Sequence, residues 1–314
     1  MPIKIPNDLP ASKILKEENI FVMDETRALS QRIRPLKLII VNIMPTKIVT
    51  ETQLLRLLSN TPLQIEVDWL CMESHNSKNT QQEHLMEFYK TFNEIKDNKY
   101  DGLIVTGAPV EKLKFEDVDY WDELTKIFDW ANTNVFSSFF ICWASQASLY
   151  YYYGVEKYQL KEKLTGVYHH HTNPEKMRRR ILRGFDYQFY APHSRYTSVK
   201  KEDIEKIDSL DILASSNDAG VYLVAEKDGS RFFVTGHPEY DPDTLDKEYH
   251  RDLAKGGDCV MPKNYYKNDD VNDEILVKWR SHAYLLFSNW LNYYVYQNTP
   301  YNLDDLLKMK TTNK

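Results

Sequence analysis

Cysteine is scarce in this chain, and its distribution excludes several classes of protein. The 314 residues contain only Cys71, Cys142 and Cys259, which lie far apart. An odd number of distant cysteines argues against a disulfide framework, and no Cys-x-x-Cys or His-Glu-x-x-His spacing indicates a metal site. We therefore expect no bound metal and at least one free thiol with a chemical role.

Long apolar runs and basic blocks are missing as well. No stretch approaches the roughly 20 apolar residues of a membrane span, and residues 1–10 contain Pro and Asp where a signal peptide has its apolar segment. The net charge of -6 is spread along the chain without a basic run that could follow a nucleic-acid backbone. We therefore expect a cytoplasmic protein with neither a membrane nor a nucleic-acid partner.

The composition that is present is typical of a globular protein. Hydrophobic residues make up 42% and charged residues 27%, unlike a disordered or fibrous chain. The length allows one large α/β domain with extensions or two small domains, and no repeat or low-complexity linker divides the chain. We predict a single domain over residues 1–300, with an N-terminal extension over about 1–35 and a loose C-terminal tail over 301–314.

Short apolar runs alternate with amphipathic segments, the pattern of a parallel sheet built from βαβ units. Strands are expected over 38–44, 63–69, 101–106, 135–141, 210–214, 221–226 and 232–235. A helix is expected over 275–296, whereas 158–195 shows no regular pattern. The predicted fold class is α/β, with a mostly parallel, doubly wound sheet and N- and C-terminal helical extensions.

One predicted strand leads directly into a cysteine. The apolar run over 135–141 is followed by Cys142 and then by helical residues. Ligands of open parallel sheets bind outside the carboxyl ends of the strands, and a helix N-terminus favours a thiolate and offers N–H groups to an oxyanion. Cys142 is therefore a candidate nucleophile, although a buried structural cysteine explains the local pattern equally well.

A second strand, over 232–235, stops at Gly236 and presents His237 and Glu239. A histidine can take the thiol proton and then act as a base, while a carboxylate can orient its ring. A lone histidine after a strand is usually a loop residue, but the strand-end Cys142 favours a catalytic role. The following histidines are interpreted as polar loop or helix residues: His75, His84, His169, His170, His171, His250 and His282.

The order of these groups along the chain resembles that of a known superfamily. A strand-end cysteine followed by His-Pro-Glu on a later strand resembles the class I glutamine amidotransferase-like, flavodoxin-like superfamily. Motifs at 42–47, 50–52, 106–111, 142–143, 162–168, 192–195 and 236–240 follow in the same order as in the homoserine O-acyltransferases of the MetA type. The resemblance covers residues 1–301, and the motifs are specific together although each is weak alone.

This resemblance implies particular roles. Cys142 would form a thioester, His237 would be the general base and Glu239 its carboxylate partner. Residues matching Lys163, Ser194 and Arg251 bind substrate in that family, which agrees with the need of an amino-acid acceptor for a cation opposite its carboxylate. Three further roles come with the resemblance: an oxyanion loop formed by Gly107, Ala108 and the N–H of Trp143, a donor-specificity position at Glu111, and possible support from Lys47 and His193.

The implied activity is homoserine O-acetyltransfer in methionine biosynthesis. The substrates would be L-homoserine and acetyl-CoA, with no bound cofactor, and the protein would be a homodimer. A glutamate at position 111 is associated with acetyl transfer and a glycine with succinyl transfer. The alternatives are succinyl transfer, serine as the acceptor, a glutamine amidotransferase-type hydrolase, and a non-catalytic binding protein. The cluster Arg178, Arg179 and Arg180 could meet coenzyme A phosphates or form a solvated loop.

Overall fold

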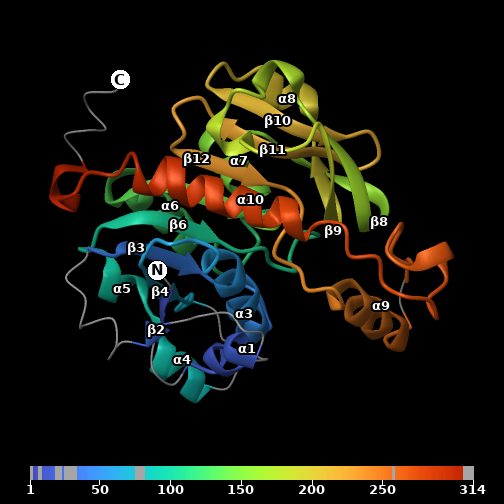
Figure 1. Cartoon of the computed structure of the whole chain (residues 1–314), viewed down its shortest axis with the longest axis horizontal. Helices are drawn as coiled ribbons and strands as arrows, with labels where there is room; N and C mark the ends of the chain where they lie inside the picture. Colours follow the sequence, from blue (N-terminus) through green and yellow to red (C-terminus); the bar gives the residue numbers. More distant parts are fainter. Residues whose placement is uncertain are drawn as a thin grey trace.

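The computed structural model describes residues 3–5, 9–17, 23–24, 34–74, 82–256 and 259–306, so that His75 lies outside the described residues. One twelve-stranded sheet runs through this part of the molecule (Figure 1). Its strands are β1 (Ile3–Ile5), β2 (Met23–Asp24), β3 (Leu36–Val41), β4 (Ile65–Leu70), β5 (Tyr89–Lys90), β6 (Tyr100–Val105), β7 (Val135–Ile141), β8 (Lys157–Thr172), β9 (Gln188–Val199), β10 (Leu210–Ser216), β11 (Gly220–Glu226) and β12 (Arg231–Val234).

The central strands are parallel and have the order β4-β3-β6-β7-β12. Numbered along the chain, this is the 2-1-3-4-5 order of flavodoxin-like sheets, whose ligands bind where the strand order reverses. The reversal lies between β3 and β6. The predicted strands over 135–141 and 232–235 are confirmed as neighbours, with Ile141 opposite Val234. The segments that follow them therefore meet at one edge of the sheet.

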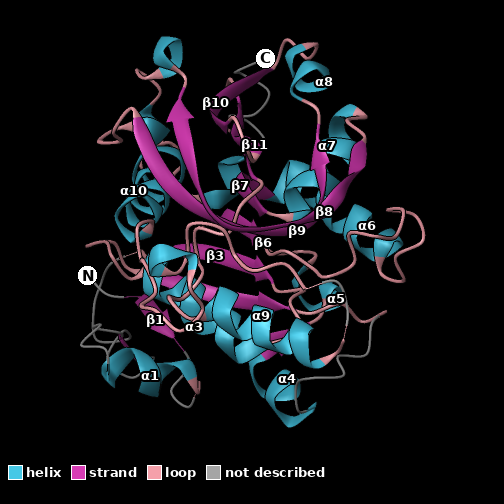
Figure 2. Cartoon of the chain, turned by 90° about the vertical axis from the view of Figure 1, so that its right-hand side faces the viewer, coloured by secondary structure: helices cyan, strands magenta, loops and turns pink. Residues whose placement is uncertain are grey.

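Helices cover both faces of these strands, as a doubly wound fold requires. The main helices are α1 (Ala11–Glu17), α3 (Lys47–Leu58), α4 (Gln82–Phe88), α5 (Phe92–Ile95), α6 (Trp121–Asn134), α7 (Trp143–Tyr153), α8 (Lys201–Glu205), α9 (Thr244–Ala254) and α10 (Arg280–Trp290), which continues as a π-helical turn over Leu291–Tyr296. Leu38 and Ile40 of β3 pack into the core beneath α3 and α10, whereas Ile39 and Val41 pack beneath α6 and α7. Figure 2 shows α10 and α6 on opposite sides of the central strands.

The expectation of no regular structure over 158–195 is wrong. β8 and β9 form a long antiparallel pair there, joined to the sheet through β10. Lysine, glutamate and histidine fill much of β8, and half of its first eight residues are exposed, so no apolar alternation marks it in the sequence. The interpretation of His169, His170 and His171 as loop or helix residues is also wrong, because all three lie in β8 and His170 is fully buried.

The ends of the chain add to this framework. β1 extends the sheet beside β4, so the predicted N-terminal extension contributes short strands as well as α1. The C-terminal helix begins at Arg280 rather than near residue 275. In the segment expected to be loose, Leu303–Asp305 form a 3-10 turn and Leu306 is buried, while 307–314 lie outside the described residues. Among the described helices, none has the length and apolar character needed to cross a membrane.

Candidate active site

A pocket of about 510 Å³ opens at the carboxyl edge of the parallel strands. Segments after four of these strands line it: Thr46 after β3, Ala108 after β6, Cys142 after β7 and His237 after β12. Residues of α9, such as Glu248, form the opposite wall. The pocket therefore lies at the point where the strand order reverses, and it brings the predicted cysteine and histidine together.

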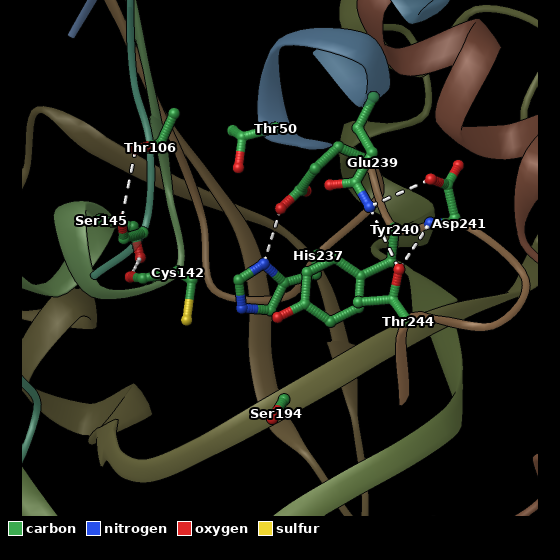
Figure 3. Close-up of polar contacts among 12 residues, drawn as sticks. Thr50, Thr106, Cys142, Ser145, Ser194, His237, Glu239, Tyr240, Asp241 and Thr244 are labelled. Carbon is green, nitrogen blue, oxygen red and sulfur yellow. Dashed lines mark hydrogen bonds and ion pairs between the residues drawn. The ribbon is translucent and has the colours of Figure 1, made fainter. Parts of the chain in front are cut away.

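Cys142 occupies a sharp turn between β7 and α7. Its backbone has φ 50° and ψ −112°, and a positive φ is costly for a residue with a side chain. The turn is held because the Cys142 N–H donates to the Val234 carbonyl at 2.7 Å and the Ser145 hydroxyl donates to the Cys142 carbonyl at 2.7 Å. Only 6% of Cys142 is exposed, and Figure 3 shows its sulfur facing the ring of His237.

His237 is fixed on both sides of its ring. Nδ1 lies 2.7 Å from Oε1 of Glu239, and because a carboxylate only accepts hydrogen bonds, Nδ1 carries the proton and Nε2 is left for the sulfur (Figure 3). The ring stacks on Tyr240 with centroids 4.1 Å apart, and the backbone N–H donates to the Pro192 carbonyl at 2.8 Å. The ring thus has one orientation, the one that a base for Cys142 needs.

The charges of this set favour a protonated imidazole. Burial lowers the pKa of His237, but the negative charges of Cys142 and Glu239 and their hydrogen bonds to the ring outweigh it, and the pKa lies well above its ordinary value. Since His237 is only 3% exposed, water does not screen these interactions. The arrangement can hold a thiolate beside an imidazolium, which is the reactive state of a cysteine nucleophile.

The predicted oxyanion residues lie close to Cys142. Trp143 is the first residue of α7, so the helix itself provides no partner for its backbone N–H. Ala108 lines the pocket, whereas Gly107 does not, and a Cβ atom added to Gly107 would lie 3.3 Å from both Cys142 and His237. A helix N-terminus and a loop after β6 therefore lie near the position that a tetrahedral oxyanion would occupy.

The predicted substrate-binding residues converge on α9. Lys163 of β8 donates to Asp252 at 2.8 Å, and the Ser194 hydroxyl of β9 donates to Glu248 at 2.5 Å. Arg251 lies at the pocket rim, where its guanidinium donates twice to Asp252 and its side chain is 53% exposed. Two cations and a hydroxyl thus line the pocket, each already paired with a carboxylate of α9.

Sequence reasoning missed the residue that links these groups. Glu248 accepts hydrogen bonds from Ser194 and from the Tyr240 hydroxyl, and its carboxylate lies 3.6 Å from Lys163. Its spacing from Arg251 places both on one helical face, but α9 itself was not predicted. The available signal was local: Asp243 precedes the helix and Arg251 lies in its last turn, where they complement the helix dipole.

Polar contacts attach α9 to the parallel half of the sheet. Asp241, just before the helix, accepts from Arg56 of α3 at 2.5 Å and from Gln53 at 3.4 Å. Thr244 joins the same group, since its hydroxyl accepts from the Asp241 N–H at 3.1 Å. The wall that carries Glu248 therefore has a defined position relative to the Cys142 side.

Glu111 lies inside the pocket. Burial raises the pKa of its carboxyl, while the positive charges of His237 and Lys163 act in the opposite direction. These interactions place the carboxyl within electrostatic range of the predicted catalytic histidine. The Glu111 carbonyl accepts from Lys157 at 2.8 Å, which fixes the loop that carries it.

Lys47 and His193 do not line the pocket. Lys47 is buried and donates to the Asn42 carbonyl, and burial lowers its pKa to about 8. His193 is fully buried, with its Nε2 3.0 Å from Nε2 of His170. Both residues lie behind the site, in the layer that supports it.

The arginine cluster is also separate from the pocket. Arg179 donates to the carbonyl groups of Glu226 and Lys227, while Arg178 and Arg180 are exposed. None of the three contributes to the pocket lining. This arrangement favours the interpretation of a structural and solvated loop.

The sheet order, with a cysteine and a histidine after adjacent strands, defines a protein of the class I glutamine amidotransferase-like fold. A glutamine amidotransferase from Thermotoga maritima has this fold, with a TM-score of 0.53 at 11% identity, covering 83% of this chain and 98% of that one. Within this class, the chain belongs to the family described as homoserine O-succinyltransferase, whose sequence model matches residues 2–301. The predicted fold class and family are confirmed.

Close relatives carry a more specific name. A protein of Catenibacterium mitsuokai named homoserine O-acetyltransferase is 72% identical over 311 residues, covering 99% of this chain and 100% of the relative. Proteins of the same name from Acetivibrio thermocellus and Petrotoga mobilis are 59% and 60% identical, each covering 98% of this chain and, in that order, 100% and 98% of the relative. The similarity therefore extends over essentially the whole length of these relatives.

Proposed function

We propose that the protein transfers an acetyl group from acetyl-CoA to the side-chain hydroxyl of L-homoserine through a thioester on Cys142. The observation that carries the proposal is the convergence of Cys142 and His237 on one pocket, with Glu239 hydrogen-bonded to His237. The name shared by relatives of up to 72% identity supports homoserine as the acceptor and acetyl as the group transferred. The product would be O-acetyl-L-homoserine, an intermediate for methionine synthesis.

The first half-reaction loads the enzyme. The Cys142 thiolate attacks the thioester carbonyl of acetyl-CoA, and the N–H groups of Trp143 and Ala108 stabilise the oxyanion. The carbon–sulfur bond to coenzyme A then breaks, and the leaving sulfur takes the proton from Nε2 of His237. An acetyl thioester on Cys142 and a neutral His237 remain.

The second half-reaction restores the enzyme. The neutral Nε2 of His237 accepts the proton of the homoserine hydroxyl as its oxygen attacks the Cys142 thioester. Collapse of the oxyanion breaks the bond to Cys142, which leaves as a thiolate beside the newly formed imidazolium. Glu239 keeps Nδ1 of His237 protonated throughout, so the same nitrogen exchanges the proton in both steps. No bound metal or redox cofactor takes part in these steps.

The acceptor would bind between β8, β9 and α9. Lys163 and Arg251 can pair with the homoserine carboxylate, and Ser194 can hydrogen-bond its polar end. Lys163 and Arg251 already contact Asp252, so its carboxylate offsets part of their positive charge. Serine is one methylene shorter than homoserine, and a pocket distinguishes such a difference only modestly.

The donor is the point on which the family description and the relatives' names differ. The family description favours a second candidate, succinyl transfer. A succinyl group ends in a carboxylate, which an ionised Glu111 in the pocket would repel and obstruct, whereas an acetyl methyl meets neither obstacle. The carboxyl of Glu111, together with the relatives' names, favours acetyl-CoA.

A trapping experiment tests the chemistry. The protein is mixed with acetyl-CoA without acceptor and digested for mass spectrometry, and we expect the acetyl group on Cys142. Cys142→Ala should show neither the adduct nor transfer, while Cys259→Ala, which changes a partly buried cysteine outside the pocket lining, should retain both. An acetyl group on another residue, or transfer by Cys142→Ala, would refute the proposal.

A donor comparison tests the specificity. Release of free coenzyme A is measured with acetyl-CoA and succinyl-CoA for the wild type and for Glu111→Gly. We expect the wild type to prefer acetyl-CoA and the variant to gain in relative succinyl-CoA use. A wild type that prefers succinyl-CoA would establish the second candidate. The proposal also includes a cytoplasmic location and a homodimer. Light scattering on the purified protein tests whether it is a dimer.

A further inference from the structure

A buried arginine lies behind the catalytic residues without a carboxylate to balance it. Arg195 of β9 is 1% exposed, and it donates to the carbonyl groups of Thr197 at 2.7 Å and Ala219 at 2.6 Å. Its Nε lies 3.4 Å from Nδ1 of His193. Throughout the described residues, no aspartate or glutamate forms an ion pair with it, which is unusual because an uncompensated buried charge is strongly unfavourable.

The neighbouring histidines cannot share this charge. The Tyr168 carbonyl only accepts, so Nδ1 of His170, 2.9 Å away, carries a proton. Arg195 only donates, so Nδ1 of His193 is the acceptor and its Nε2 carries the proton that lies between the two rings. Burial lowers the pKa of His170 to about 3 and that of His193 well below its ordinary value. Both rings are therefore neutral, and each has one defined tautomer.

The catalytic set has the opposite imbalance. With Cys142 as thiolate, His237 as imidazolium and Glu239 as carboxylate, its net charge is minus one. Oε2 of Glu239 is buried and has no hydrogen-bond partner among the described residues, so this negative charge is not satisfied locally. The positive charge of Arg195, which interacts with Cys142, has the opposite sign. Glu111, when ionised, and Lys163 are other charged groups that act at this site.

Short connections join Arg195 to the Cys142 turn. The Thr197 carbonyl that accepts from Arg195 also accepts from the side-chain amide of Gln146 at 3.3 Å, and the Thr197 hydroxyl donates to Gln146 at 2.8 Å. Gln146 lies in the first turn of α7, and its backbone N–H donates to the Cys142 carbonyl. Burial lowers the pKa of Arg195, while the negative charge of Cys142 raises it, so the two groups interact electrostatically.

We propose that Arg195 is a positioning residue whose fixed positive charge, held by β9, balances the catalytic set and stabilises the Cys142 thiolate. The proposal rests on the proposed role of Cys142 and adds the source of its activation. A lysine at position 195 would preserve the charge and lose the forked hydrogen bonds, whereas a methionine would fill similar space without a charge. Comparing these two substitutions separates the effect of the charge at position 195 from the effect of its packing.

The test measures the rate at which iodoacetamide alkylates Cys142 as a function of pH, in the full-length protein without substrates. Only the thiolate reacts, so the pH at which the alkylation rate is half of its maximum, the midpoint, reports formation of the Cys142 thiolate. We expect Arg195→Met to raise the midpoint by about one unit, the size of effect that a nearby charge produces, and Arg195→Lys to stay near the wild type. An unchanged midpoint in Arg195→Met, or an equal shift in both variants, would overturn the inference.

Two further measurements keep the test decisive. Arg231→Met removes a part-buried arginine that pairs with Glu226 away from the pocket, and it should leave the midpoint unchanged. If Arg195→Met does not fold, ¹⁵N spectra of the histidine rings in the wild type should show His170 and His193 neutral and unchanged between about pH 5 and about pH 9. Uptake of a second proton by either ring in that range would overturn the inference.

Mass spectrometry of the alkylated protein separates this inference from the proposed function. If iodoacetamide modifies other cysteines and leaves Cys142 untouched, the nucleophile proposal fails. If Cys142 is modified but its pH profile does not respond to Arg195→Met, only the role of Arg195 fails.

Discussion

Gly107 lies beside both Cys142 and His237. A Cβ atom at position 107 would lie 3.3 Å from Cβ of Cys142 and 3.3 Å from Cε1 of His237. Contacts this short are tight, so an added side chain would displace Cys142, His237 or the loop after β6. A residue with no side chain thus determines how closely the side chains after β7 and β12 approach each other.

We therefore predict that Gly107→Ala lowers kcat about tenfold or more, because small displacements of reacting groups are costly. The matched control is Gly154→Ala, which also changes a glycine next to α7. Gly154 has φ +69° and no other atom within 4 Å of an added Cβ, so alanine there should cost about 1 kcal/mol of stability and leave kcat unchanged. Steady-state kinetics and thermal unfolding check both variants, and wild-type kcat in Gly107→Ala would contradict the prediction.

The catalytic histidine and its carboxylate should differ in importance. His237→Asn removes the proton carrier, and we expect kcat/KM to fall about 10²- to 10⁴-fold. Glu239→Gln should cost much less, because the glutamine oxygen can still accept the Nδ1 hydrogen bond of His237 and only the charge is lost. Kinetics of both variants give the order of damage. Equal activity of His237→Asn and wild type would remove the histidine from the mechanism.

The substrate-binding proposal predicts a selective effect on KM. Lys163→Ala and Arg251→Ala should raise the KM for homoserine about tenfold and that for acetyl-CoA much less, because each removes a charge partner of a small carboxylate. Lys255→Ala, an exposed cation beyond the same helix, is the control and should change neither constant. If the KM for acetyl-CoA rises instead, these residues belong to the donor site.

Donor preference should depend on pH through Glu111. Burial raises the pKa of this carboxyl, so protonation removes its negative charge at a higher pH than for an exposed glutamate. We expect the ratio of succinyl-CoA to acetyl-CoA use to rise as the pH falls from about 8 to about 5.5, while the succinyl carboxylate stays largely ionised. Taking the ratio cancels the ionisation of Cys142 and His237, which both donors share. In Glu111→Gln the ratio should be constant, and a pH-independent ratio in the wild type would contradict the prediction.

The parallel half of the fold could be predicted because its strands are buried on both faces and appear as apolar runs. This pattern located Cys142 and His237 at strand ends, and the sheet order then brings those ends together. The wall formed by β8, β9 and α9 could not be derived in this way. Leu245 is the only buried residue in α9, and β8 begins with exposed polar residues, so hydrophobic periodicity is weak in both. Glu248 and Arg195 depend on contacts between distant segments, which sequence spacing does not report.

The weak burial of α9 has an evolutionary consequence. The helix that would face the acceptor is held by the polar contacts of Asp241 and Thr244, with Leu245 as its anchor in the apolar interior. Cys142 and His237, the proposed nucleophile and base, instead follow strands β7 and β12 of the central sheet. Under the proposed function, substitutions on the exposed face of α9 would change acceptor preference with little effect on the core. Under the proposed function, such a division would allow acceptor preference to diversify while the residues at the strand ends are kept.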